Sequence, residues 1–131
     1  IYLFAGADET AFTKTCEWLA SGADSPLVTS RKEGADIDGV IDVRGVYQRP
    51  HAEIQMGELP EVLLPHSGAL GLQDYEKAYS AAGVDPSIYD LRGIDAEKGA
   101  AIIVRPDQYV AEVLPLDDTA GIARFKARAL V

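Results

Sequence analysis

Cys16 is the side chain in this sequence best suited to act as a nucleophile or a redox group. A reactive thiol needs a pKa lowered by a helix N-terminus or a nearby cation, and a redox pair needs a second cysteine. The chain has one cysteine, and Cys16 shares helical spacing with Phe12 and Leu19. A cysteine in such an apolar stripe behaves as a small hydrophobic residue. We therefore predict a buried structural thiol and keep a reactive thiol as the less favoured alternative.

Other residues used in catalysis or metal binding lack partners at useful spacing. His51 and His66 lie beside prolines, without cysteines or carboxylates at ligand spacing. Two pairs of aspartates have the type for acid–base or cation chemistry: Asp36 with Asp38, and Asp117 with Asp118. Turns and helix caps explain both pairs. We expect no catalytic, cofactor-binding or metal-ligating residue in this chain.

Backbone motifs for nucleotide binding or acyl transfer are also missing. The sequence has no G-x-G-x-x-G and no Gly-x-Ser-x-Gly. Its Gly68-Ala69-Leu70-Gly71 stretch has no strand immediately before it and is typical of a plain loop.

The run Arg105-Pro106-Asp107 sets two charged residues around a rigid proline between two apolar segments. One hypothesis has Asp107 hydrogen-bonding its own turn while Arg105 pairs with a carboxylate such as Glu112, or with a helix C-terminus. The other has Arg105, Asp107 and Tyr109 in contact with another domain or subunit. Both roles stay open at this point.

The positions of these residues depend on elements predicted from the apolar pattern. In the first half of the chain we expect a strand at 1–5, a helix at 8–21, mostly loop at 22–39, a strand at 40–47, and an edge strand or extended connector at 61–65. In the second half we expect a helix at 74–83, a short helix or turn at 86–91, and strands at 100–104 and 109–114. A last helix begins at Asp117 or Asp118 and has Ile122, Phe125, Ala129 and Leu130 on its apolar face.

This order predicts an α/β fold of thioredoxin-like type. A central mixed sheet of four or five strands is flanked by helices on both faces, and a C-terminal ββα unit completes the sheet. A doubly wound fold with the same elements remains an alternative. The 131 residues fit a single domain, residues 1–131.

Composition excludes several classes of function. A net charge of −9 argues against binding to nucleic acid or to an anionic membrane surface. The apolar runs, such as 100–104, are far too short to span a bilayer. A single cysteine fits a reducing compartment, so we expect a cytoplasmic protein.

The run from Ala101 to Val110, followed by Leu114-Pro115-Leu116-Asp117, resembles the C-terminal segment of the phenol 2-monooxygenase and 3-hydroxybenzoate 4-monooxygenase family of aromatic hydroxylases. Similar segments of that family occur upstream in the same order: Leu63-Leu64-Pro65, Gly71 to Lys77, and Ile88-Tyr89-Asp90. The resemblance extends over about residues 1–130 and is strongest in the last third.

The resemblance implies a thioredoxin-like C-terminal domain without an active site of its own. Its partners are then the FAD and substrate domains of the same polypeptide and, in a homodimer, a second subunit. FAD and NAD(P)H serve the parent enzyme outside this chain. A first residue other than methionine and the missing G-x-G-x-x-G agree with such a fragment. Gly6-Ala7-Asp8-Glu9 stands where thioredoxin has Cys-x-x-Cys.

Two other classes of function remain as alternatives. One is a free-standing thioredoxin-like redox protein that works through Cys16. The other is a small-molecule or peptide-binding module built on Tyr75, Tyr79 and Tyr89, although packing in the core is the simpler role for these tyrosines. The aromatic substrate of a parent enzyme cannot be inferred, because its pocket lies outside this chain.

Overall fold

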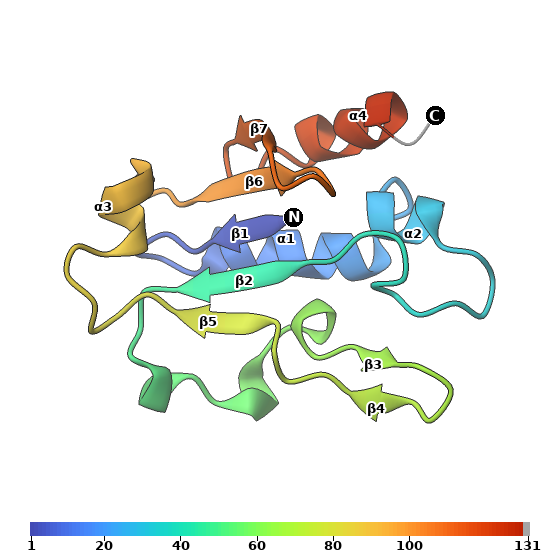
Figure 1. Ribbon diagram of the computed structural model, residues 1–131, viewed down its shortest axis with the longest axis horizontal. Helices are drawn as coiled ribbons and strands as arrows, with labels where there is room; N and C mark the ends of the chain where they lie inside the picture. Colours follow the sequence, from blue (N-terminus) through green and yellow to red (C-terminus); the bar gives the residue numbers. More distant parts are fainter. Residues whose placement is uncertain (130–131) are drawn as a thin grey trace.

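The computed structural model describes residues 1–129, which form one mixed five-stranded sheet with helices and a separate small hairpin (Figure 1). The elements in chain order are β1 (Tyr2–Phe4), α1 (Thr10–Ser21), α2 (Pro26–Ser30), β2 (Arg44–Tyr47), the 3₁₀ turns η1 (His51–Glu53), η2 (Met56–Glu58) and η3 (Glu61–Leu63), β3 (His66–Ser67), β4 (Leu72–Gln73), β5 (Ala78–Ser80), α3 (Ile88–Arg92), β6 (Ala100–Val104), β7 (Val110–Leu114) and α4 (Thr119–Ala129).

The sheet confirms the predicted thioredoxin-like arrangement. Its strand order is β5-β2-β1-β6-β7. Strand β1 runs parallel to β2 and antiparallel to β6, and β6 continues through a hairpin into β7. A βα unit and a C-terminal ββα unit therefore share one sheet, and β5 extends it beyond β2.

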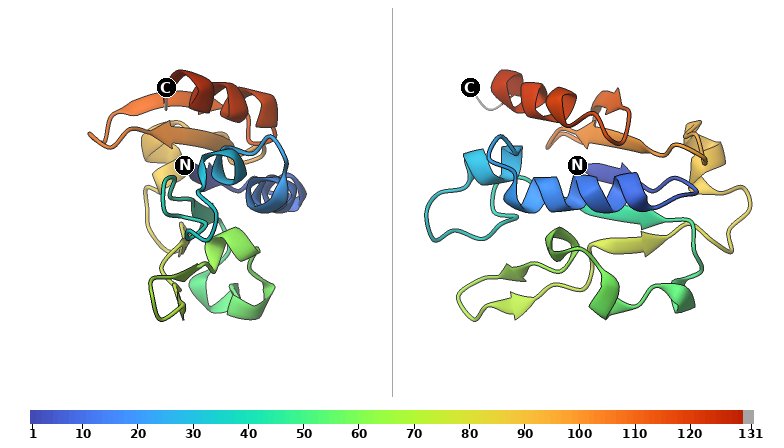
Figure 2. Two further views of the ribbon diagram at one scale, coloured as in Figure 1. Left: turned by 90° about the vertical axis from the view of Figure 1, so that its right-hand side faces the viewer. Right: turned by 180° about the vertical axis from the view of Figure 1, so that it is seen from behind.

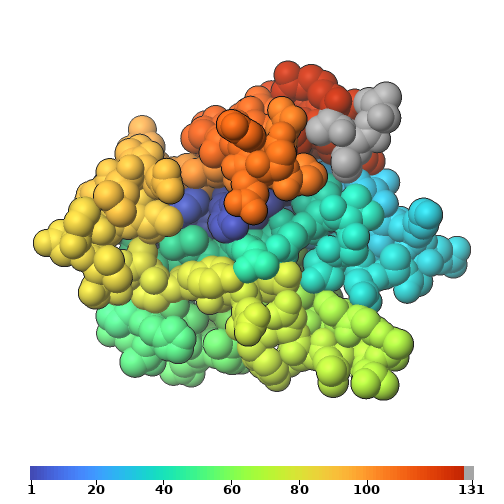
Figure 3. Space-filling model, viewed as in Figure 1, coloured from blue at the N-terminus to red at the C-terminus, as the bar shows by residue number. Residues whose placement is uncertain are grey.

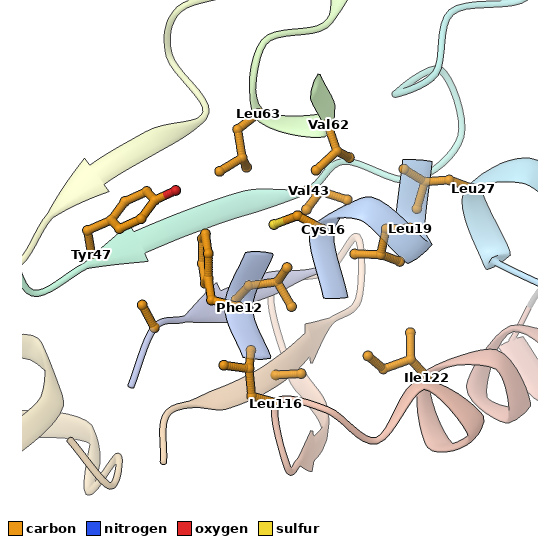
Figure 4. Packing of buried hydrophobic residues seen from close by; sticks show 13 residues of the cluster. Phe12, Cys16, Leu19, Leu27, Val43, Tyr47, Val62, Leu63, Leu116 and Ile122 are labelled. Carbon is orange, nitrogen blue, oxygen red and sulfur yellow. The ribbon is translucent and has the colours of Figure 1, made fainter. Parts of the chain in front are cut away.

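Helix α1 covers one face of the sheet because its apolar residues recur at helical spacing. Asp8 accepts the amide hydrogen of Thr10 at 2.8 Å at the start of this helix. Phe12, Cys16 and Leu19 are fully buried and form the centre of the main core (Figure 4). Helix α4 lies on the same side, as the views from the side and from behind show (Figure 2). It adds Ile122 to this core.

The opposite face is covered at one end only, by α3. A capping box between Ser87 and Asp90 starts this five-residue helix, and Gly93 ends it in the left-handed conformation. Its Tyr89 packs edge-to-face on Phe4, with ring centroids 5.6 Å apart, and its hydroxyl donates to the carbonyl of Ala5 at 2.7 Å. Helices therefore lie on both faces, as expected, but α3 covers its face at one end only.

The C-terminal ββα unit agrees closely with the prediction. The second strand begins one residue later than expected, at Val110. Asp118 precedes α4 and accepts the amide hydrogen of Gly121 at 2.8 Å, as predicted for a cap. Ile122 is buried and Phe125 half-buried, whereas the predicted positions of Ala129 and Leu130 on the apolar face lie outside the described side chains. No helix within residues 1–129 is long and apolar enough to cross a membrane.

The helix predicted at 74–83 is wrong. Asp74 accepts the amide hydrogen of Glu76 at 2.7 Å in a turn, and the chain then enters β5. β5 pairs in parallel with β2, with Val46 opposite Tyr79. Ladder formation at the sheet edge therefore overrides the high helix propensity of the segment.

Three smaller expectations also need correction. The segment 22–39 contains a short helix, α2, whose start is capped by the Ser25 hydroxyl. In the segment 61–65, residues 61–63 form a 3₁₀ turn rather than an edge strand or extended connector, and this turn buries Val62 and Leu63 against α1. The second strand starts at Arg44 instead of Val40. Residues 68–71 form the turn between β3 and β4, which is consistent with the predicted loop.

Candidate interaction surface

The Cys16 thiol lies in the core, which confirms its predicted burial. Its side chain is fully inaccessible and sits between Phe12 and Leu19. Burial, together with the nearby Glu17 carboxylate, raises the pKa of the thiol to about 12. At pH 8 this thiol is therefore almost entirely protonated, whereas an exposed cysteine is partly ionised.

We expect the Cys16 thiol to be unreactive in the folded protein. A disulfide-exchange reagent at pH 8 should modify it at least 100-fold more slowly than a free thiol and should titrate one thiol per chain after denaturation. Leu91→Cys is a suitable control because Leu91 is 66% exposed, and the new thiol should react rapidly. Fast stoichiometric modification of the wild-type chain would contradict the structural role.

The histidines and aspartate pairs do not converge on one site. His66 contacts the carbonyl of Gly71 through Nδ1 at 2.9 Å, inside the β3–β4 hairpin, while His51 lies in η1. Asp36 accepts the amide hydrogen of Gly68 at 2.9 Å, so it holds the same hairpin. Within residues 1–129, no group of three His, Cys, Asp or Glu side chains could hold a metal ion.

Lys77 forms a charge cluster that the sequence did not predict. Its side chain is 8% exposed, and its ammonium lies 2.5 Å from Asp42, 3.4 Å from Asp38 and 3.6 Å from Asp74. Burial works to lower the pKa of Lys77, but the hydrogen bond to Asp42 and the three carboxylates outweigh it and raise the pKa. The cluster ties the loop before β2 to the start of β5, a structural role.

The tip of the β6–β7 hairpin is an exposed ion pair. Arg105 contacts Asp107 at 2.7 Å, and Asp107 also accepts the amide hydrogen of Tyr109 at 3.3 Å. The hydrogen bond of Asp107 within its own turn is therefore confirmed, but Arg105 pairs with Asp107 and not with Glu112, which contacts Arg128 instead. The Tyr109 side chain is 72% exposed. A contact of these residues with another domain or subunit stays a prediction.

The three tyrosines proposed for ligand binding have separate environments. Tyr89 belongs to the small core under α3. Tyr75 is 55% exposed and donates to the Gln73 side chain, whereas Tyr79 donates to the backbone carbonyl of Glu76. Core packing, the simpler role, therefore holds for Tyr89 alone.

Side chains on the sheet face opposite α1 form a row across four strands. Tyr2 lies opposite Arg44 in β2 and opposite Ile102 in β6, and Ile102 lies opposite Val113 in β7. Side chains directly opposite each other in a ladder point to the same face. Tyr2 is 37% exposed and Val113 is 62% exposed, while Ile102 and Arg44 are half-buried. These four residues, with Tyr79, Val104 and Val110 beside them, are called the open face below.

The open face is the part of the sheet that α3 leaves uncovered. Figure 3 looks onto it and shows the N-terminal strand in blue at the bottom of a hollow between α3 and the β6–β7 hairpin. The neighbouring row of Ala100, Phe4 and Val46 lies under α3 in the small core instead. The strand alternation and a short helix at 86–91 were both predicted from the sequence, but the sequence did not show which part of the sheet this helix covers.

Arg44 is held in place at one end of the open face. Its Nε donates to the Asp42 carboxylate at 2.8 Å, and its guanidinium lies over the Tyr79 ring, 6.0 Å from the centroid. It also donates to the Tyr79 hydroxyl. The guanidinium is therefore ordered before any partner arrives, which reduces the entropy lost in a contact.

Comparison with known proteins gives one family. Residues 1–131 match the family model described as phenol hydroxylase, C-terminal dimerisation domain. The chain is 42% identical to a 3-hydroxybenzoate 4-monooxygenase of Comamonas testosteroni, over 95% of this chain and 21% of that protein. It is 38% identical to the FAD-dependent monooxygenase terD of Aspergillus terreus, over 70% of this chain and 16% of that protein. The chain thus spans about a fifth of the length of these curated relatives.

Proposed function

We propose that this chain is the non-catalytic C-terminal domain of a longer FAD-dependent aromatic hydroxylase and joins two such polypeptides as a homodimer. The basis is that the chain belongs to the family of phenol hydroxylase C-terminal dimerisation domains. The observation that carries the proposal is the match of the family over all 131 residues. The family resemblance inferred from the hairpin sequence is thereby confirmed.

The side chains support a role in contact rather than catalysis. The Cys16 thiol is buried and its pKa is raised. The ammonium of Lys77 forms ion pairs with carboxylates of the same chain, and the two histidines lie in different segments. FAD and NAD(P)H are accordingly assigned to the other domains of the parent enzyme, as is the phenol or hydroxybenzoate substrate. We place the enzyme in the cytoplasm, in keeping with the single cysteine.

Removing residues 1–131 from the longer polypeptide tests this proposal. We expect the truncated enzyme to sediment with the mass of a single shortened polypeptide, and not of a dimer, while it retains bound FAD and its visible flavin absorbance. We also expect the 131-residue chain alone to bind no flavin and to hydroxylate no phenol. A truncated enzyme that stays dimeric, or an isolated chain that carries FAD, would contradict it.

A further inference from the structure

The open face has the composition of a subunit interface. It presents two tyrosines and one arginine beside aliphatic residues, and none of its strand positions carries a lysine or a carboxylate. Tyr and Arg are enriched in protein interfaces, and Lys, Glu and Asp are depleted. We propose that a second copy of this chain packs on the open face, an inference that rests on the proposed dimerisation function.

The charge of the open face is compatible with contact between two acidic chains. The chain carries 21 acidic and 12 basic residues, so two copies repel each other with a net charge of −9 on each. Like charges brought together in an interface oppose association, so two copies meet more easily where carboxylates are absent. The Asp42 carboxylate at the rim is compensated by Arg44 and Lys77.

The geometry suits contact between two identical sheets. Tyr2, Ile102 and Val113 lie in register on adjacent strands, so they form a continuous apolar strip rather than scattered exposed residues. Two sheets pack face to face at about 10 Å when their inner faces carry such side chains. A two-fold axis brings the same strip of both copies together, which is the usual geometry of a homodimer.

The strip continues to the edge of the sheet. β7 is an edge strand, and Val110 and Val113 are 59% and 62% exposed. Val110 pairs with Val104 next to the bulge in the β6–β7 ladder. The exposed Tyr109 directly precedes Val110, at the hairpin tip. The contact role predicted for Tyr109 is therefore continuous with the proposed interface.

Glutamates placed in the strip should break the dimer. In the longer polypeptide, Val110→Glu together with Val113→Glu brings four new negative charges into the contact, and we expect the dimer dissociation constant from sedimentation equilibrium to rise at least 100-fold. Both positions are exposed, so circular dichroism should show an unchanged fold. Val113→Thr keeps the β-branched shape and should weaken the dimer about tenfold, which provides a second variant without a charge.

Leu72→Glu is the matched control because Leu72 is a strand residue with 67% exposure, on the β3–β4 hairpin. It should leave the dimer intact. A monomeric wild-type enzyme would refute the proposed function itself. If the wild type is a dimer and the double glutamate variant is also a dimer, only the assignment of the open face is overturned. This holds whether or not the glutamates lower the stability of the fold, as they would if another segment of the same polypeptide covers the face. Dissociation by Leu72→Glu alone would move the interface to the hairpin.

Discussion

Gly99→Ala adds a single methyl group, yet we expect it to lower the free energy of unfolding by about 4 kcal/mol or more. This is the largest loss of stability that we predict. A Cβ at Gly99 would lie 2.1 Å from the carbonyl oxygen of Phe4 and 2.8 Å from the amide nitrogen of Gly6. Both neighbours are backbone atoms at the end of β1. They cannot retreat without disturbing the pairing of β1 with β6, in which Phe4 lies opposite Ala100.

Gly93→Ala separates this clash from ordinary backbone strain. Gly99 and Gly93 have φ values of +69° and +65°, but a Cβ at Gly93 meets no atom within 4 Å. Alanine at Gly93 should therefore cost only about 1–2 kcal/mol, the penalty for a left-handed residue. Urea unfolding followed by circular dichroism measures both variants. Equal losses at the two glycines would show that the close approach at Gly99 has no energetic importance.

This close approach joins the βα unit and the C-terminal ββα unit, which share one sheet. A Cβ at Gly6 would likewise lie 2.4 Å from the carbonyl oxygen of Glu97. The segment before β6 therefore crosses the end of β1 at backbone contact distance, and Ala7 donates to the Glu97 carbonyl at 3.2 Å. Gly6, between β1 and α1, is thus a point of close backbone packing, which a sequence pattern does not show.

The end of the chain was the most predictable part because its signals are local. An apolar run at 100–104, a turn, a second run and an aspartate before an amphipathic helix each occupy few residues. β5 was missed because its strand state depends on pairing with β2, more than 30 positions earlier in the chain. Local propensity contains no information on that pairing.

The candidate surface was less predictable than the fold. Arg105, Asp107 and Tyr109 stand out in the sequence, and the structure does place them at an exposed tip. The open face instead requires knowledge of which part of the sheet each helix covers, and the sequence did not place the predicted short helix over Phe4 and Val46. The same holds for Lys77, whose carboxylate partners in the loop before β2 lie 35 and 39 positions away in the sequence.

Lys77→Met should have the second-largest effect, a loss of about 2–3 kcal/mol of unfolding free energy at pH 7. Removing one partner of a buried ion pair costs about 3–5 kcal/mol. The figure is reduced here because Asp42 and Asp74 have side chains that are 43% and 31% exposed, so water screens part of the repulsion that remains. Methionine preserves the apolar stem of Lys77, so the change reports mainly on charge.

Arg105→Met is the matched control for burial. The Arg105–Asp107 pair is as short, at 2.7 Å, but its side chains are 60% and 45% exposed. Exposed pairs contribute about 0–1 kcal/mol, so this variant should be nearly as stable as the wild type. Urea is the denaturant of choice because guanidinium salt would screen the charges under test. Similar losses for both variants would contradict the importance of the buried cluster.

The effect of pH gives this prediction its sharpest form. Burial works to raise the pKa of Asp42, but the hydrogen bonds from Lys77 and Arg44 outweigh it and lower the pKa. A carboxyl whose pKa is lowered by folding stabilises the protein above its unfolded pKa of about 3.9 and loses that contribution as the pH falls through the folded value. The raised pKa of Lys77 stabilises the folded protein fully below about pH 10.4, and this stabilisation is lost only above that pH.

The difference in unfolding free energy between wild type and Lys77→Met should therefore be largest from about pH 5 to pH 9. It should shrink toward pH 3, because protonated carboxyls carry no charge for the ammonium to compensate. A gap that stays constant down to pH 3 would mean that Lys77 stabilises the fold by packing of its stem and not by charge.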